Sequence, residues 1–191
     1  MSASVEPQRQ NRLILTLCGS LRAASSNREI LRAYERVAPA GLQFLHYEGL
    51  ALLSHFNPDL DGDPLPTAVI ELRRLIAAVD AIVISTPEYA HGLPGAFKNA
   101  LDWSVSDPAF TGKAVVILHA ARGSDWALNS LQEILRTMSA RVLDDAQVLL
   151  PLGTNRITAE QILGREDLAA ALSFSAEQLA RFLDHSETSR E

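Results

Sequence analysis

The sequence predicts an α/β fold in which helices cover both faces of an open parallel sheet. Two observations predict this class: short apolar runs rich in β-branched residues, and amphipathic helical stretches that separate them. Continuous apolar runs suit strands buried on both faces, as the strands of parallel sheets are. The runs are LILTLC (13–18), AIVIS (81–85), AVVILHAA (114–121) and QVLLPL (147–152), and the mixed run LQFLHY (42–47) is typical of an edge strand.

The segments between the runs repeat apolar residues at helical spacing. Their apolar faces are Ile30, Leu31, Tyr34 and Val37; Val69, Leu72, Ile76 and Val79; Leu128, Leu131, Leu135 and Met138; and Leu168, Leu172, Leu179 and Phe182. Alternating strands and helices predict a doubly wound sheet with right-handed crossovers. Five strands in the order 2-1-3-4-5 form a flavodoxin-like three-layer sandwich. Ligands bind such sheets at the carboxyl ends of the strands, so we search the loops after strands one, three and four.

Length, charge and cysteine content narrow the function classes. The chain has 191 residues and no internal linker, so we expect one domain over 12–184, with flexible tails at 1–11 and 185–191. The formal net charge of -6 disfavours nucleic-acid binding, which needs a basic face. The single cysteine, Cys18, excludes an internal disulfide framework and a thiolate zinc cluster. No apolar stretch is long enough for a membrane span, and no secretory signal is present, so we expect a cytoplasmic protein.

The loop after the first predicted strand is rich in hydroxyl groups. It lacks the three glycines of a dinucleotide fingerprint and the Gly-Lys-Ser/Thr of a P-loop. Neutral donors, an arginine and a helix N-terminus suit a terminal monophosphate better than a pyrophosphate. Helix capping by a serine or asparagine is the alternative interpretation. The candidate residues are Ser20, Arg22, Ser25, Ser26 and Asn27.

The loop after the predicted strand 81–85 is rigid and bent. Pro87 and Gly92 flank its centre, and Pro94 is placed to be the first residue of the next helix. Free backbone amides here can hydrogen-bond the edge of a flat heterocycle, while Tyr89 supplies apolar contact.

Together, the segments GSLRxxSxN (19–27) and PEYxHGxPGxxKNAxDW (87–103) resemble the NAD(P)H-dependent FMN reductase family of flavodoxin-like proteins. The resemblance implies that Ser20, Arg22, Ser25 and Asn27, with the backbone of Ser26, bind the FMN phosphate. It implies that the second motif, Pro87, Glu88, Tyr89, Ala90, His91 and Gly92, holds the isoalloxazine ring. It also implies a homodimer or homotetramer with the 98–103 helix near a subunit interface, which gives Trp103 two possible environments, a partner chain or the core.

The chain departs from the family pattern at three places. Many members have Asn where this chain has Ala90, and Ser where it has Gly92. The family often carries a glycine-rich stretch after strand four, whereas residues 119–124 here read HAARGS, in which Gly123 alone is glycine. Trp126, just beyond this stretch, either reaches the predicted flavin site or only packs against the rest of the fold. His91 could be a pH-sensitive group beside the flavin, but a loop histidine is more often exposed to solvent or a backbone cap, and the same holds for His119 at a strand end.

The sequence shows no recognisable Ser-His-Asp set, cysteine nucleophile or carboxylate dyad. We therefore assign no catalytic side chain and expect the flavin to be the group that reacts. Nor do we expect a metal site, because Asp59, Asp61 and Asp63 lack the remaining ligands of a calcium loop. The resemblance implies an oxidoreductase that passes a hydride from NADPH or NADH through FMN to a small acceptor. A quinone, an azo compound, a metal oxyanion or free flavin could fill that role. The alternatives are a flavodoxin-like electron carrier and a scaffold that has lost flavin.

Overall fold

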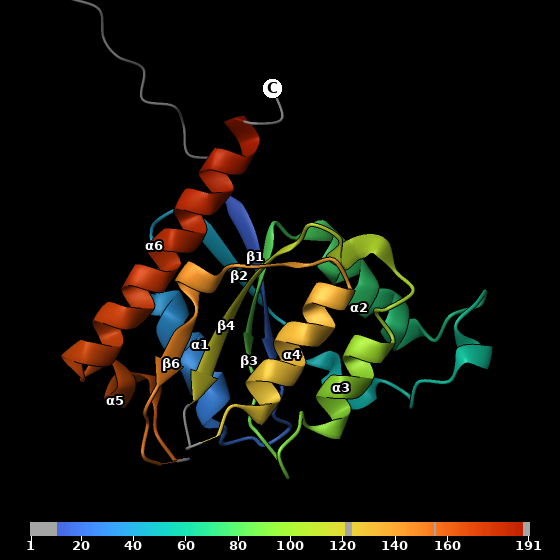
Figure 1. The fold of residues 1–191 in the computed structure, drawn as a ribbon, viewed down its shortest axis with the longest axis horizontal. Coiled ribbons are helices and arrows are strands. Elements are labelled where there is room, and N and C mark those ends of the chain that lie inside the picture. The colour runs from blue at the N-terminus through green and yellow to red at the C-terminus, as the bar shows by residue number, and fades with distance from the viewer. Residues whose placement is uncertain (1–10, 121–123, 155, 189–191) are drawn as a thin grey trace, which may run out of the picture.

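The computed structural model describes residues 11–120, 124–154 and 156–188, which form a three-layer α/β sandwich (Figure 1). Its strands are β1 (Arg12–Cys18), β2 (Leu42–His46), β3 (Ala81–Ser85), β4 (Ala114–Ala120), β5 (Arg141–Val142) and β6 (Val148–Leu150). Its α-helices are α1 (Ser26–Val37), α2 (Thr67–Ala78), α3 (Gly95–Asp102), α4 (Trp126–Thr137), α5 (Ala159–Leu163) and α6 (Glu166–Thr188). Short 3-10 turns occur at Gly49–Leu52, Pro58–Leu60, Pro108–Phe110 and Asp144–Ala146.

All strand pairs are parallel, and the strand order is β2-β1-β3-β4-β5, with β6 also paired to β4. The flavodoxin-like order 2-1-3-4-5 is therefore confirmed, with one difference. Two short pieces, β5 and β6, share the fifth position, separated by the 3-10 turn Asp144–Ala146. Only Val148–Leu150 of the expected run 147–152 is strand, because the two residues after Leu150 include Pro151, which has no N–H to donate to a ladder.

The core lies in two layers, one on each face of the sheet. Successive side chains of a strand point to opposite faces, so Ile14 joins the layer under α1, α5 and α6, whereas Leu15 joins the layer under α2, α3 and α4. Every residue of β3 is buried, which explains why its first four residues, Ala81 to Ile84, are all apolar instead of alternating with polar ones. The two helical layers lie on either side of the sheet in Figure 1.

The predicted elements agree with the observed ones apart from their ends. β3 and the starts of β1 and β4 fall within one residue of the apolar runs, and β2 is an edge strand as its mixed pattern predicts. Val79 and Met138 belong to the expected apolar faces but follow the last residues of α2 and α4. Pro94 precedes the first helical residue, Gly95, instead of being that residue. Ala121, the last residue of the predicted 114–121 run, lies outside the described residues.

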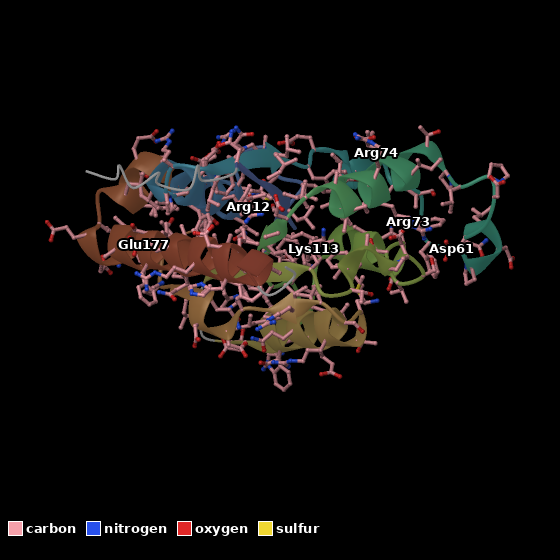
Figure 2. All side chains as sticks on the ribbon, turned by 90° about the horizontal axis from the view of Figure 1, so that it is seen from above. Arg12, Asp61, Arg73, Arg74, Lys113 and Glu177 are labelled. Carbon is pink, nitrogen blue, oxygen red and sulfur yellow. The ribbon has the colours of Figure 1, made fainter. Side chains whose placement is uncertain are left out.

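The segment between β2 and α2 is held against the α2–α3 side of the fold by hydrogen bonds and an ion pair. Trp103, directly after α3, is fully buried, and its indole Nε1 donates to the carbonyl of Ser54 at 2.7 Å. Asp61 pairs with Arg73 of α2 at 2.7 Å, at the edge of the molecule (Figure 2). Core packing within the chain is thus the environment of Trp103. On α3 itself, Lys98 and Asp102, four residues apart, form an ion pair.

The last helix, α6, continues to Thr188, beyond the domain boundary expected at residue 184. The remainder of the expected tails, 1–10 and 189–191, lies outside the described residues. Among the helices of the described segments, none combines the length and the apolar character that a membrane span requires.

Candidate functional site

A cavity of about 420 Å³ lies at the carboxyl ends of β1, β3 and β4. These strands run toward the lower edge of the view in Figure 1. Its size falls within the range of small-molecule sites, about 300–1,000 Å³. Ten of the eleven residues selected from the sequence line it: Ser20, Arg22, Ser25, Ser26, Asn27, Pro87, Glu88, Tyr89, Ala90 and His91. His119, Ala120 and Ser124 complete the lining. The eleventh selected residue, Gly92, lies outside the lining.

The loops after β1 and β3 touch directly beneath the cavity. A Cβ added to Gly19 would lie 2.0 Å from Oγ1 of Thr86, so the closeness of the two loops depends on glycine at this position. The Gly19 N–H donates to the carbonyl of Ser85 at 2.9 Å, which continues the pairing of β1 with β3 into the loop. Two segments far apart in the sequence therefore form one continuous cavity wall.

The loop after β1 and the start of α1 bring polar side chains to the cavity. Ser25 occupies the N-cap position of α1, but its side chain makes no capping hydrogen bond. Ser25, Ser26 and Asn27 are buried and line the cavity at the start of this helix, where backbone N–H groups and the helix dipole favour an anion. Arg22 is exposed, and its guanidinium has no hydrogen bond or ion pair with the residues that the structure describes. Helix capping by Ser25, the alternative interpretation, is therefore not observed.

Asn27 combines a structural role with a place in the cavity wall. Its side-chain Oδ1 lies 3.0 Å from the hydroxyl of Ser85, which in turn lies 2.9 Å from the carbonyl of Leu118 on β4. This contact links the first turn of α1 to the ends of β3 and β4. The side-chain amide of Asn27 is a further hydrogen-bond donor at the cavity.

Tyr89 to Gly92 form a tight turn at the tip of the loop after β3. Tyr89 and Gly92 exchange two backbone hydrogen bonds of 3.0 Å, and the central residues Ala90 and His91 have φ values of 48° and 60°. Two successive left-handed residues are the pattern of a type I′ turn, which usually holds Asn or Gly. Within the described part of the chain, the N–H groups of Ala90 and His91 are not hydrogen-bonded. The turn thus offers two backbone donors at the cavity.

Glu88 connects this turn to α4. Its carboxylate accepts the N–H of Ala127 at 2.9 Å and the hydroxyl of Ser124. The Ala127 N–H contributes most to lowering the pKa of Glu88, followed by Ser124, and the nearby imidazoles of His91 and His119 contribute less. Glu88 therefore caps α4 from another loop. Asp125, the N-cap residue of that helix, makes no side-chain cap of its own.

His119 is a cavity residue that the motifs did not select. It stands near the end of β4 and is 5 % exposed, and its buried Nε2 has no hydrogen-bond partner among the described residues. Oδ1 of Asp125 lies 3.5 Å from Nε2, but the contact does not meet hydrogen-bond geometry. Its place at the end of a central parallel strand is the signal that could have selected it. Ala121, Arg122 and Gly123, in the loop that departs from the family pattern, lie outside the described residues.

The donor set suits FMN. One end of the cavity collects Arg22, buried hydroxyl groups and a helix N-terminus, which fit a monophosphate. The other end presents the N–H groups of a left-handed turn and Nε2 of His119, which is not hydrogen-bonded to a described residue; these groups fit the polar edge of a flavin ring. A larger hollow of about 810 Å³ lies at the amino ends of the strands beside α6, near Arg12 and Lys113 (Figure 2). It lies at the edge opposite to the one where open α/β sheets bind ligands.

Known proteins resemble this chain over most of its length. A family profile described as NADPH-dependent FMN reductase matches residues 13–155. The NADH:(hydroxy)cinnamate reductase subunit CrdA of Vibrio ruber is 34% identical over 142 residues, which cover 71% of this chain and 69% of that protein. A quinone reductase of Escherichia coli is 29% identical over 150 residues, which cover 75% of this chain and 80% of that protein.

A solved structure supports the same fold. The flavoenzyme NAD(P)H:(acceptor) oxidoreductase FerB of Paracoccus denitrificans superposes with a TM-score of 0.73 at 24% identity, covering 91% of this chain and 98% of that one. At this identity the likeness establishes the fold alone. The profile match spans both motifs of the cavity, Gly19–Asn27 and Pro87–Trp103. The chain therefore belongs to the NADPH-dependent FMN reductase family, whose members are oxidoreductases that use FMN and a nicotinamide donor.

Proposed function

We propose that this protein holds FMN in the cavity at the carboxyl ends of β1, β3 and β4, and passes a hydride from NADPH or NADH through it to a quinone. One observation carries the proposal: the two motifs, about 60 residues apart in the sequence, line a single cavity at the ligand-binding edge of the sheet.

Ser20, Arg22, Ser25, Ser26 and Asn27 would hold the FMN phosphate. The guanidinium of Arg22 is available for a charge-assisted hydrogen bond, and the start of α1 supplies neutral donors and a favourable dipole. The three arginines of α1 are each paired with a glutamate, and none of them lines the cavity: Arg28 with Glu48, Arg32 with Glu29 and Arg36 with Glu160.

The loop after β3 would hold the ring. Pro87, Tyr89, Ala90 and His91 line this part of the cavity, while Glu88 and Gly92 fix the shape of the loop by their hydrogen bonds. FMN supplies the hydride-accepting and hydride-donating chemistry when it is bound. The N–H groups of Ala90 and His91 are preorganised donors, which stabilise negative charge that develops beside them without reorganisation.

The names of relatives favour a quinone among the four acceptor classes. The Escherichia coli relative is named a quinone reductase, and a Burkholderia relative, 28% identical over 160 residues, is named a 2-hydroxy-1,4-benzoquinone reductase. A flat neutral ring is also compatible with a cavity that opens beside aromatic side chains.

An anaerobic visible spectrum tests the proposal. The protein is loaded with FMN, desalted, and mixed with NADPH or NADH, followed by duroquinone. We expect retained flavin that bleaches rapidly with one donor and recovers its colour with the quinone. Retained flavin that neither donor reduces would indicate the electron carrier instead. A protein that retains no flavin would indicate the flavin-free scaffold.

A further inference from the structure

Two aromatic side chains stack at the surface beside the cavity. The rings of His91 and Trp126 are 5.9 Å apart between centroids and inclined by only 16°, an offset parallel stack. His91 lines the cavity, whereas Trp126 lies outside the lining and is 59% exposed. The pair, here called the aromatic ledge, therefore extends the cavity wall outward to solvent.

The exposure of the ledge is not explained by packing. The other tryptophan, Trp103, is fully buried and donates its indole N–H to Ser54, whereas the indole of Trp126 makes no hydrogen bond with the described residues. Tyr89, two residues before His91, is also 51% exposed. Large exposed aromatic groups gathered beside a cavity are typical of a binding surface.

The ledge is held in place from both sides. His91 stands in the left-handed turn closed by Tyr89 and Gly92, and Trp126 is the first residue of α4. Glu88 joins these two segments through its hydrogen bonds to Ala127 and Ser124. A surface that is already ordered loses little conformational entropy when a ring stacks on it.

The negative charges near the ledge favour one class of ligand over another. The carboxylate of Asp125, directly before Trp126, is 61% exposed, and the carboxylate of Glu88 accepts the N–H of Ala127, directly after it. Two carboxylates disfavour the diphosphate of a dinucleotide but not an uncharged ring. Building on the proposed function, we propose that the aromatic ledge of His91 and Trp126 receives the planar ring of the quinone acceptor and thereby selects ring-shaped acceptors over others.

Acceptor selectivity tests this role in the FMN-loaded enzyme. Duroquinone serves as the planar acceptor, because its four methyl groups prevent addition to cysteine or lysine, and ferricyanide serves as an acceptor without a ring. We expect Trp126→Ala to lower the ratio of kcat/KM for duroquinone to that for ferricyanide between about two- and tenfold, the range of one aromatic pair. Trp126→Phe should restore the ratio, and Phe174→Ala, which removes an exposed aromatic residue of α6, should leave it unchanged.

Three results would overturn the role. An unchanged ratio in Trp126→Ala would mean that Trp126 only supports the turn. A raised KM for the nicotinamide donor would place the donor on the ledge instead. A ratio that Trp126→Phe fails to restore would exclude ring stacking as the cause.

A binding measurement separates this inference from the proposed function, since it needs no turnover. The two indole N–H signals of the oxidised, FMN-loaded protein are followed by NMR as duroquinone is added, and Trp126→Phe assigns them. We expect the Trp126 signal to shift saturably and the Trp103 signal to stay in place. A stationary Trp126 signal, or equal shifts of both, would contradict the ledge even if the enzyme reduces quinones. Failure of NADPH and NADH to bleach the flavin would contradict the proposed function alone.

Discussion

The carboxylate of Glu88 accepts the backbone N–H of Ala127 at 2.9 Å, so a residue of the loop after β3 caps the helix that follows β4. The same carboxylate accepts the hydroxyl of Ser124, and Glu88 and Ser124 both line the cavity. The capping role explains why the first turn of α4 needs no side-chain cap from Asp125. It also means that the stability of α4 and the shape of the ring-binding loop depend on the same side chain.

Glu88→Gln should make stability less dependent on pH. The pKa of Glu88 in the folded protein is lowered below its ordinary value, so the carboxylate stabilises the fold above the pKa of the unfolded chain. That contribution is lost as the pH falls through the folded pKa. We therefore expect the free energy of unfolding of Glu88→Gln to lie below wild type at pH 7, with the gap closing toward pH 3, as measured by urea denaturation. Glu133→Gln, at an exposed position of α4, is the control, and a gap that is constant with pH would contradict the prediction.

Ala90→Asn should stabilise the protein. Ala90 has a φ of 48°, and the left-handed region costs an alanine about 1–2 kcal/mol, whereas asparagine enters it more readily. We expect the free energy of unfolding to rise by about 1 kcal/mol. Ala40→Asn, at an exposed position without a left-handed φ, should give no gain. Equal effects of the two substitutions would show that the turn at 89–92 is not strained.

Gly19→Ala should destabilise the protein and impair flavin binding. The added methyl group would lie 2.0 Å from Oγ1 and 2.5 Å from Cβ of Thr86, so the loops after β1 and β3 must separate. Overpacking of this kind lowers the free energy of unfolding by about 1–3 kcal/mol. Gly95→Ala is the matched control, since its Cβ would meet no atom within 4 Å. Thermal unfolding and FMN titration of both variants check the prediction, which fails if Gly19→Ala matches the control.

Arg22→Ala should weaken FMN binding by about 1.5–3 kcal/mol, the contribution of a charge-assisted hydrogen bond. Riboflavin, which lacks the phosphate, should bind the variant and the wild type equally well. Arg74→Ala, which removes a surface arginine of α2 paired with Glu71, should change neither affinity (Figure 2). An equal loss for FMN and riboflavin would show that Arg22 acts on the ring or on the fold instead of on the phosphate.

Most of the fold could be predicted because its central strands are buried on both faces. The apolar residues of Ala81–Ser85 predict a strand buried on both faces, and the mixed polar and apolar residues of Leu42–His46 predict an edge strand. The division of the fifth strand position was not predicted, because the two-residue strand β5 is too short to produce a periodic pattern. Helix ends were also displaced, because apolar residues such as Val79 and Met138 continue to pack after the helical hydrogen bonds end.

The residues that line the cavity could be predicted from the two motifs, but the hydrogen bonds and contacts of the individual side chains could not. The resemblance assigns Glu88 and Gly92 to the residues that hold the ring, and the structure adds that Glu88 caps α4 and that Gly92 closes the turn. His119 was passed over because a lone histidine at a strand end has no recognisable spacing. The stack of His91 on Trp126 joins residues 35 positions apart, which only the tertiary fold brings together.

Titration of the flavin-free protein with FMN and with riboflavin, followed by flavin fluorescence, tests the central claim most directly. The claim is that the cavity between the loops after β1 and β3 holds FMN by its phosphate and its ring. We expect one FMN per chain, bound at least about tenfold more tightly than riboflavin, since the phosphate contacts add 1.4 kcal/mol or more. Equal affinities would contradict the phosphate site, and the absence of binding by either flavin would contradict the claim as a whole.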